Sequence, residues 1–173
     1  IEAIREEVET AVREGSTCIV LSDKDFSSQK ASIPSILTVG AVHSHLVKHG
    51  LRGYCSLNVE CSDAMDTHSF AILIGVGATT VNPYLAIDSI YQRFEKKLFG
   101  KSDFETCINK FKKSIDAGLL KIMSKMGISV ISSYRGGCNF EAVGLSRAIV
   151  SDYFPGMSSR ISGIGIIGIE KKI

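Results

Sequence analysis

Apolar residues along this chain follow two patterns, one with the spacing of a helix face and one of short unbroken runs. The helical pattern opens the chain, where Ile1, Ile4, Val8 and Val12 share one face and Gly15 ends the segment. Similar signals predict further helices over 32–49, 67–74, 87–98, 104–126, 140–145 and 148–154. Helices therefore recur along the whole chain.

Short apolar runs separate these helices and predict buried strands. They cover 17–21, 55–59, 79–82 and 129–133. The last lies within Gly118–Gly137, where Gly127 stops a helix and Ile128, Val130 and Ile131 favour a covered strand. Strands that alternate with helices pair in parallel through crossovers. The predicted fold class is therefore α/β, with parallel strands alternating with helices in an open sheet or an incomplete, barrel-like one.

Polar side chains stand at the carboxyl end of each predicted strand. Asp23 follows the first strand, Glu60 the second, Asn82 the third, and Tyr134 with Arg135 the fourth. Because parallel strands bring their carboxyl ends to one edge, where α/β folds hold their functional sites, we interpret these residues as a candidate binding edge. The alternative is that the fourth unit is only one more part of the core.

Small residues predict close contacts and breaks within the helices. Gly40, Ala41 and Ser44 lie at helical spacing, so another element can approach the helix closely there. Gly118 falls inside the long segment 104–126 and is expected to interrupt it.

The final stretch, 161–173, is glycine-rich and apolar and has no obvious packing partner within the chain. Exposed β-branched residues in such number promote association. We therefore interpret 1–173 as a single piece whose tail, from about residue 158, contacts another domain.

Composition narrows the class of protein. The chain has 173 residues, enough for one domain, and a net charge of +2, which gives no electrostatic case for nucleic acid or membrane binding. No apolar run reaches the length of a membrane span, and no signal peptide is predicted, so a cytoplasmic location is expected. The chain begins with Ile1 rather than Met, which favours a fragment of a longer protein.

Metal and thiol chemistry find little support in the sequence. His45 and His49 are one turn apart, as in a zinc helix, but Leu46 replaces the glutamate of a metalloprotease. We therefore predict no metal site, and we interpret His43 as a core histidine. Reduced thiols without scaffold or cluster spacing are predicted for Cys18, Cys55, Cys61, Cys107 and Cys138.

Several long blocks, in order along the chain, resemble the large subunit of glutamate synthase. They are IPSILTVGAVHSHLVKHGLR (Ile33–Arg52), SFAILIGVGATTVNPYLA (Ser69–Ala86), GLLKIMSKMGISVISSYRGG (Gly118–Gly137), FEAVGLS (Phe140–Ser146) and SRISGIGI (Ser159–Ile166). The similarity covers nearly the whole chain without large gaps, and so many blocks together are specific.

The resemblance implies an enzyme that makes two glutamates from glutamine and 2-oxoglutarate. An amidotransferase domain hydrolyses glutamine, and the ammonia travels to a barrel that carries FMN and a 3Fe-4S cluster. The blocks resemble the C-terminal part of the central domain that joins the two, so the resemblance implies no catalytic residue, cofactor or metal ligand in this segment. Its partners would be the amidotransferase and FMN-barrel domains of the same chain, with a small electron-donating subunit or ferredoxin, in the bacterial cytosol or a plastid.

This chain departs from the family pattern at several helix and loop positions. His43, Ser44 and His45 stand where the family usually has three histidines, and Cys61-Ser62-Asp63 replaces Thr-Gly-Glu. Gly75-Val76-Gly77 replaces Gly-Tyr-Gly, and Gly137-Cys138-Asn139 replaces a smaller residue, a glutamine and an apolar residue. These changes leave the fold assignment intact and bear on contacts between domains.

Two other classes of protein stay open at this point. One is a stand-alone α/β binding module in which Arg135 and the neighbouring glycines hold an anion. The other is a non-functional remnant of a glutamate synthase gene. An amidotransferase sequence upstream and an FMN-barrel sequence downstream would favour the enzyme over both.

Overall fold

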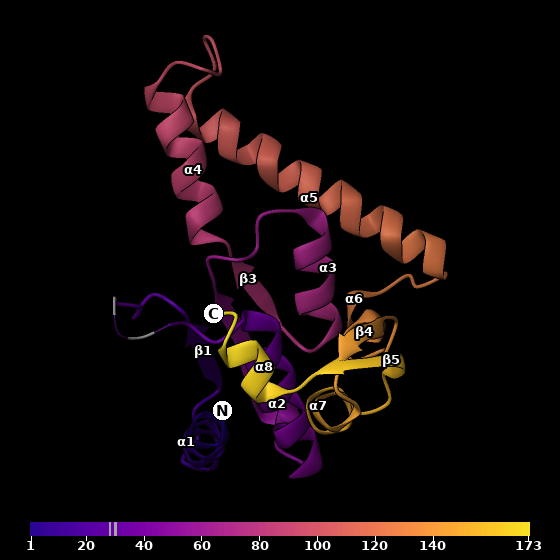
Figure 1. Cartoon of the computed structure of the whole chain (residues 1–173). Helices are drawn as coiled ribbons and strands as arrows, with labels where there is room; N and C mark the ends of the chain where they lie inside the picture. Colours follow the sequence, from indigo (N-terminus) through magenta and orange to yellow (C-terminus); the bar gives the residue numbers. More distant parts are fainter. Residues whose placement is uncertain (28, 30) are drawn as a thin grey trace.

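The computed structural model describes residues 1–27, 29 and 31–173, with parallel strands in two small sheets (Figure 1). The first sheet contains β1 (Cys18–Ser22), β2 (Ser56–Glu60) and β3 (Thr80–Asn82) in that order. The second contains β4 (Glu141–Leu145) and β5 (Ser158–Ile164), also parallel. The α/β prediction is confirmed, and within the described residues both sheets are open and form no closed barrel.

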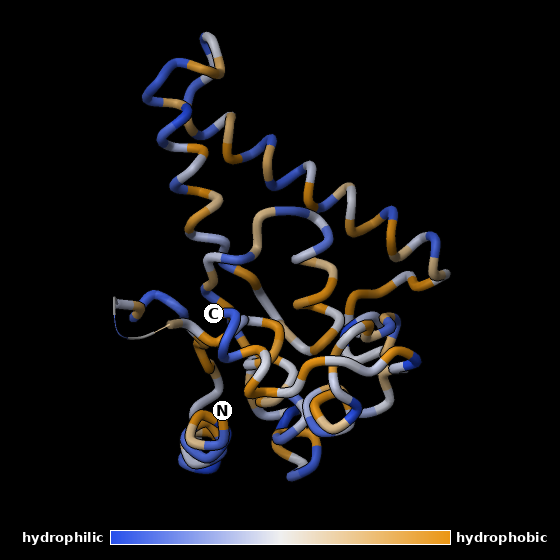
Figure 2. The backbone as a smooth tube through the Cα atoms, viewed as in Figure 1, coloured by the Kyte–Doolittle hydropathy of each residue, from blue (hydrophilic) through white to orange (hydrophobic). Residues whose placement is uncertain are grey.

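Three helices cover one face of the first sheet: α1 (Glu2–Arg13), α2 (Ser35–Lys48) and α3 (Thr67–Gly75). Their apolar stripes turn toward Leu57 and Val59 of β2, which are fully buried or nearly so. In Figure 2, the apolar residues of α1 lie on the side toward the sheet and its polar residues on the outer side. The amphipathic spacing that predicts the helices therefore also determines which side of each helix meets the sheet.

The opposite face of the first sheet is uncovered in the described part of the chain. Residues alternate along each strand, so Ile19 and Leu57 point inward while Cys18, Val20 and Thr80 point outward. The Val20 residue is 60% exposed although it lies in a parallel strand. Parallel sheets are normally covered on both faces, so this face is incomplete within the described residues.

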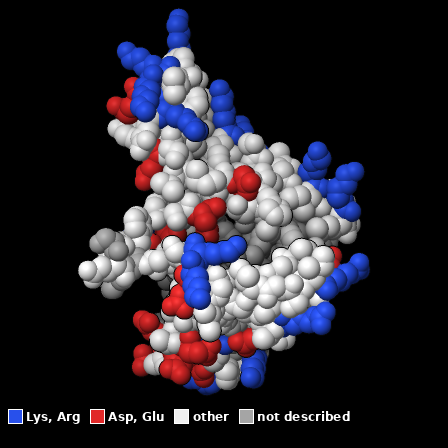
Figure 3. Space-filling view, viewed as in Figure 1, with Lys and Arg blue, Asp and Glu red and all other residues white. Residues whose placement is uncertain are grey.

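A long helical hairpin projects away from the sheet (Figure 1). It consists of α4 (Tyr84–Glu95) and α5 (Phe104–Met126), and Tyr91 and Phe104 pack edge to face with ring centres 5.5 Å apart. Lysine and arginine side chains gather at its far end, whereas acidic side chains gather over α1 (Figure 3). The expected break at Gly118 is absent: α5 continues through it, and a Cβ there would overlap Thr67 of α3.

The predicted strand over 129–133 is wrong. Gly127 ends α5 in a left-handed conformation as expected, but a short helix, α6 (Ile131–Tyr134), follows. Val130 and Ile131 are 52% and 40% exposed, and β3 has no strand partner on its free edge within the described residues. The β-branched composition of the segment was therefore misleading, because strand preference is expressed only where a sheet position exists.

The predicted helix over 140–145 is also wrong, because this segment forms β4 and pairs with β5. The helix between them, α7 (Arg147–Tyr153), agrees with the prediction over 148–154, and the three make a βαβ unit. The tail therefore has a partner within the chain, contrary to expectation. Its last element is α8 (Ile166–Glu170), from which Ile169 packs against the main core.

The close approach predicted at Gly40 and Ser44 is confirmed, and the approaching element is α7. A Cβ on Gly40 would overlap the Phe154 ring, and Ser44 Oγ donates to the Tyr153 carbonyl at 2.8 Å. The buried Arg5 lies over the Tyr153 ring, 4.8 Å from its centre, and so connects α1 to α7. None of the helices in the described residues is both long and apolar enough to cross a membrane.

Candidate functional site

Three of the predicted edge residues meet at the carboxyl ends of the first sheet. Glu60 lies in register between Ser22 and Asn82. Its carboxylate accepts hydrogen bonds from Lys24 Nζ at 2.7 Å, Ser22 Oγ at 2.9 Å and Asn82 Nδ2 at 3.2 Å. The Lys24 and Ser22 bonds lower the pKa of Glu60, so a carboxylate stands at the rim of the uncovered sheet face.

Asp23 reaches this edge from the loop that follows β1. Its Oδ2 accepts from the Ser62 amide at 2.8 Å and from Ser62 Oγ at 2.6 Å, whereas Oδ1 is buried without a partner among the described residues. Burial acts to raise the pKa of Asp23, but hydrogen bonding, chiefly from Ser62, outweighs burial and the net shift of the pKa is downward. Asp63, the residue after Ser62, accepts a hydrogen bond from the Ser35 amide at 3.1 Å and so caps the start of α2.

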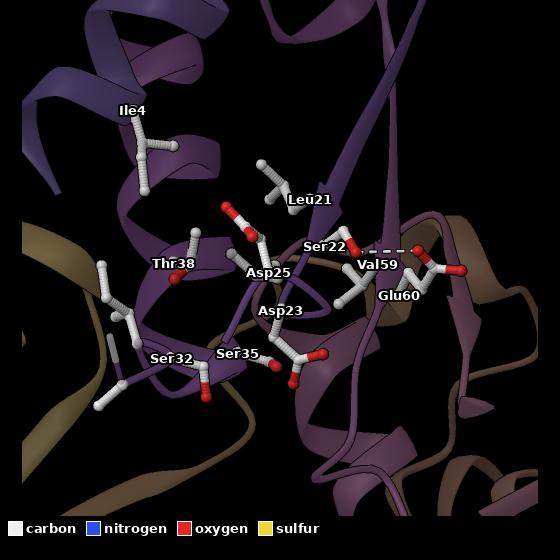
Figure 4. Close-up of a pocket in the computed structure, with 13 residues that line it drawn as sticks. Ile4, Leu21, Ser22, Asp23, Asp25, Ser32, Ser35, Thr38, Val59 and Glu60 are labelled. Atoms are coloured by element: carbon white, nitrogen blue, oxygen red, sulfur yellow. Dashed lines mark hydrogen bonds between the residues drawn. The ribbon is translucent and has the colours of Figure 1, made fainter. Parts of the chain in front are cut away.

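A cavity of about 200 Å³ opens beside these residues, between the strand ends and α2 (Figure 4). The cavity is lined by the apolar Leu21, Val39 and Val59 and by polar residues that include Asp23 and Thr38. Pockets for drug-sized ligands measure roughly 300–1,000 Å³, so this cavity suits one side chain or a few waters better than a flavin.

The structure does not bring Tyr134 and Arg135 to this edge. Tyr134 is fully buried, and its hydroxyl donates to the Ala71 carbonyl at 3.1 Å. Arg135 Nε donates to the carbonyl of Ala78, which precedes β3, at 3.1 Å. Arg135 therefore lies at the amino end of β3 and Tyr134 is buried against α3, so the predicted five-residue edge is wrong as a single site.

Sequence reasoning missed a basic cluster at the amino end of β3. Arg52 donates to His43 Nδ1 at 3.0 Å, to the Gly77 carbonyl at 2.9 Å and to Thr79 Oγ1 at 3.2 Å. Neither Arg52 nor Arg135 forms a salt bridge within the described residues. No spacing pattern pointed to Arg52, because these partners come from α2 and from the α3–β3 connection, which are distant from each other along the chain.

The cysteines stand apart from the one close group of three metal-ligating side chains among the described residues. An iron–sulfur cluster needs several thiolates close together. Burial, with Asp63 nearby, raises the pKa of Cys61 to about 12, so that thiol is protonated at neutral pH.

The family model of the glutamate synthase central domain matches residues 1–146. The chain belongs to this family. It is 58% identical, over all of its 173 residues, to the large chain of NADPH glutamate synthase from Azospirillum brasilense. It is 43% identical over 168 residues, 96% of this chain, to the corresponding Bacillus subtilis protein, and 41% identical over 183 aligned positions, 99% of this chain, to ferredoxin-dependent glutamate synthase of Pyropia yezoensis.

The resemblance seen in the sequence blocks is thus confirmed, and the chain is part of a family of oxidoreductases. It spans only 11% of the length of the first two relatives and 12% of the third. The family match ends at residue 146, just after β4, whereas the 58% identity continues through α7, β5 and α8.

Proposed function

We propose that this central-domain segment is a structural connector in a glutamate synthase and supplies no catalytic residue of its own. The observation that carries the proposal is the match to the central-domain family over residues 1–146. In the whole enzyme, glutamine, 2-oxoglutarate and a reductant give two glutamates, and this segment would join the glutaminase domain to the FMN barrel.

The partners and cofactors follow from that placement. The amidotransferase and FMN-barrel domains of the same chain would contact this segment, and FMN and the 3Fe-4S cluster would lie outside it. Relatives are named for NADPH, NADH or ferredoxin. We propose that the reductant reaches this enzyme through a small electron-donating subunit or ferredoxin. Bacterial and chloroplastic relatives support a bacterial cytosol or a plastid as the compartment.

Two surfaces with exposed apolar residues support a connecting role. The first is the uncovered face of the three-stranded sheet, which a parallel sheet normally buries. The second lies on the β4–β5 unit and the start of α8, where Val143, Ile161 and Ile167 are 64%, 61% and 70% exposed. Burying such a side chain stabilises a protein by roughly 1.5–3 kcal/mol, so the remainder of the polypeptide is the natural occupant of both.

The absence of catalytic residues can be tested in the full-length enzyme with Asp23→Asn and Glu60→Gln. Each variant keeps the shape of the side chain and removes the charge. We expect glutaminase activity and ammonia-dependent reductant oxidation each to stay within about threefold of wild type, because a lost catalytic acid or base typically costs 10²–10⁴-fold. Steady-state assays of the two partial reactions measure this.

A loss of a hundredfold or more in one partial reaction, with unchanged circular dichroism, would show that the edge takes part in catalysis. The purified 173-residue chain provides a second check. It should bind no flavin, carry no iron–sulfur cluster and hydrolyse no glutamine. An FMN absorbance band in that preparation would show that the segment has been placed wrongly within the enzyme.

A further inference from the structure

Three metal-binding side chains converge on the outside of the α1–α2 pair. Glu9 comes from α1, His45 from the last turn of α2, and His49 from the C-cap position that directly follows this helix. Each offers one ligand atom, and these atoms lie within 4.8 Å of one another. This is the one such group of three in the described part of the chain.

The spacing is close to that of a zinc site. His45 Nε2 lies 2.6 Å from Glu9 Oε2, and His49 Nδ1 lies 3.8 Å from the same oxygen. His49 Nδ1 also donates to the His45 carbonyl oxygen at 2.9 Å, so zinc binding at this nitrogen would replace that hydrogen bond. A tetrahedral zinc ion with bonds of about 2.0–2.1 Å holds its ligands about 3.4 Å apart, so small side-chain rotations would centre an ion among the three. The two imidazoles already lie close together, with ring centres 4.3 Å apart and the ring planes tilted by 48°.

The surroundings hold the carboxylate in place and leave the group accessible. Arg13 binds the other oxygen of Glu9 at 2.8 Å and leaves Oε2 for the histidines. The side chains of Glu9, His45 and His49 are 21%, 17% and 35% exposed, so an ion can enter without unfolding the pair. Acidic side chains gather over α1 (Figure 3) and favour a cation there, although Arg13 opposes it in part.

We propose that Glu9, His45 and His49 bind a zinc ion, with water in the fourth position, and that the ion clamps α1 to α2. Two imidazoles and one carboxylate are an established ligand set for zinc. The sequence predicted no metal because the third ligand does not follow the histidine pair. It lies 36 residues before His45 and reaches it only through the packing of α1 on α2.

The test is zinc binding by the 173-residue chain in a Cys18→Ser, Cys138→Ser background, because these two exposed thiols would otherwise bind zinc. Equilibrium dialysis at micromolar free zinc, followed by elemental analysis, should give one ion per chain. The thermal midpoint should rise with zinc, since the ion binds the folded state. His49→Ala should weaken binding about tenfold or more, because even changes in the second shell of a metal site cost 10–100-fold.

The matched control is His68→Ala, which removes an exposed histidine at the start of α3 and should leave binding and midpoint shift unchanged. Cobalt provides an independent readout, because a tetrahedral site with nitrogen ligands gives intense visible bands that hexaaqua cobalt lacks. Absence of bound zinc at micromolar concentration would overturn the proposal. So would one bound ion that His49→Ala does not weaken, since the ion would then lie elsewhere.

Discussion

His43 shows how position sets the chemistry of a single residue in this domain. It is partly buried and accepts a hydrogen bond from Arg52, while Arg135 lies nearby. Burial, followed by the charges of Arg52 and Arg135, lowers the pKa of His43 from 6.5 to about 4. The imidazole is therefore neutral at pH 7, and protonation would remove the acceptor that Arg52 uses.

We expect this residue to make the domain less stable in mild acid. Between pH 6.5 and 4 the unfolded chain binds a proton at His43 that the folded chain does not, so its contribution is complete above pH 6.5 and lost as the pH falls through that window. At about 1.4 kcal/mol per pKa unit, the loss is at most about 3.5 kcal/mol. Urea unfolding of wild type and His43→Gln at several pH values measures it.

The stability gap between wild type and His43→Gln should narrow as the pH falls. His68→Gln, at an exposed site, should keep a constant gap from wild type and serves as the control. A wild-type advantage over His43→Gln that stays constant between pH 7 and pH 4 would contradict the prediction.

At the scale of elements, the presence of a neighbouring strand determined secondary structure more than the local preference of the sequence for helix or strand. The segment 140–145 became a strand because β5 lies beside it, although α7 and a turn separate the two in sequence. The predicted strand over 129–133 has no such neighbour and ends in the short helix α6. Partners distant along the chain therefore decided both outcomes.

Truncation after Phe154 tests whether the tail belongs to this core. The tail contains β5, and its residues Met157 and Ile169 pack against the larger hydrophobic core. Its removal therefore leaves β4 without a partner strand and exposes part of that core to water. We expect the thermal midpoint to fall by about 5–10 °C, because each kcal/mol lost shifts it by roughly 2–4 °C in a domain of this size. Differential scanning calorimetry measures the change.

The matched control removes only 171–173, which lie beyond α8 and are exposed. That shorter deletion should leave the midpoint unchanged. An unchanged midpoint after the longer truncation would show instead that β5 and α8 are held in place by other domains alone.

At the scale of the whole molecule, the chain buries one side of its first sheet under helices and leaves the other side exposed. Residues of α1, α2 and α3 close one side of the first sheet, and the other side is exposed at Val20 and Thr80. The chain is about a ninth of its two bacterial relatives in length, at 11% of each. The exposed side is therefore where we expect neighbouring domains to pack.

Val20→Asp tests that expectation. The side chain is exposed in this segment, so the isolated chain should keep its thermal midpoint within about 2 °C, as surface substitutions usually change stability by no more than about 0.5 kcal/mol. In the full-length enzyme the charge would be buried against another domain and should loosen the junction. We expect glutamine-dependent glutamate synthesis to fall several-fold, with free ammonia released, while ammonia-dependent synthesis is retained.

Leu120→Asp is the control, because Leu120 is 66% exposed on α5 and away from the sheet face. This substitution should change neither the thermal midpoint of the isolated chain nor glutamine-dependent glutamate synthesis in the full-length enzyme. If the Val20→Asp enzyme makes glutamate from glutamine as well as wild type and releases no extra ammonia, the uncovered side of the sheet is exposed to solvent in the enzyme. The domains would then meet at another surface.

The sequence by itself determined the elements whose periodicity is local. The first five helices were predictable because apolar residues recur in them at helical spacing, and the first three strands because each lies in a short apolar run; both signals are local. The contact at Gly40 and Ser44 was predictable because small residues mark a close approach. The family could be identified because long blocks match in order.

Only the tertiary structure decided which side chains share a site. Arg135 lies at the amino end of β3 because its own segment is not a strand, whereas Asp23 and Glu60 meet at the carboxyl ends of two paired ones. Glu9 stands beside His45 because α1 packs on α2 across 36 residues of chain. Periodicity describes one element at a time, and such neighbourhoods depend on how several elements pack against one another.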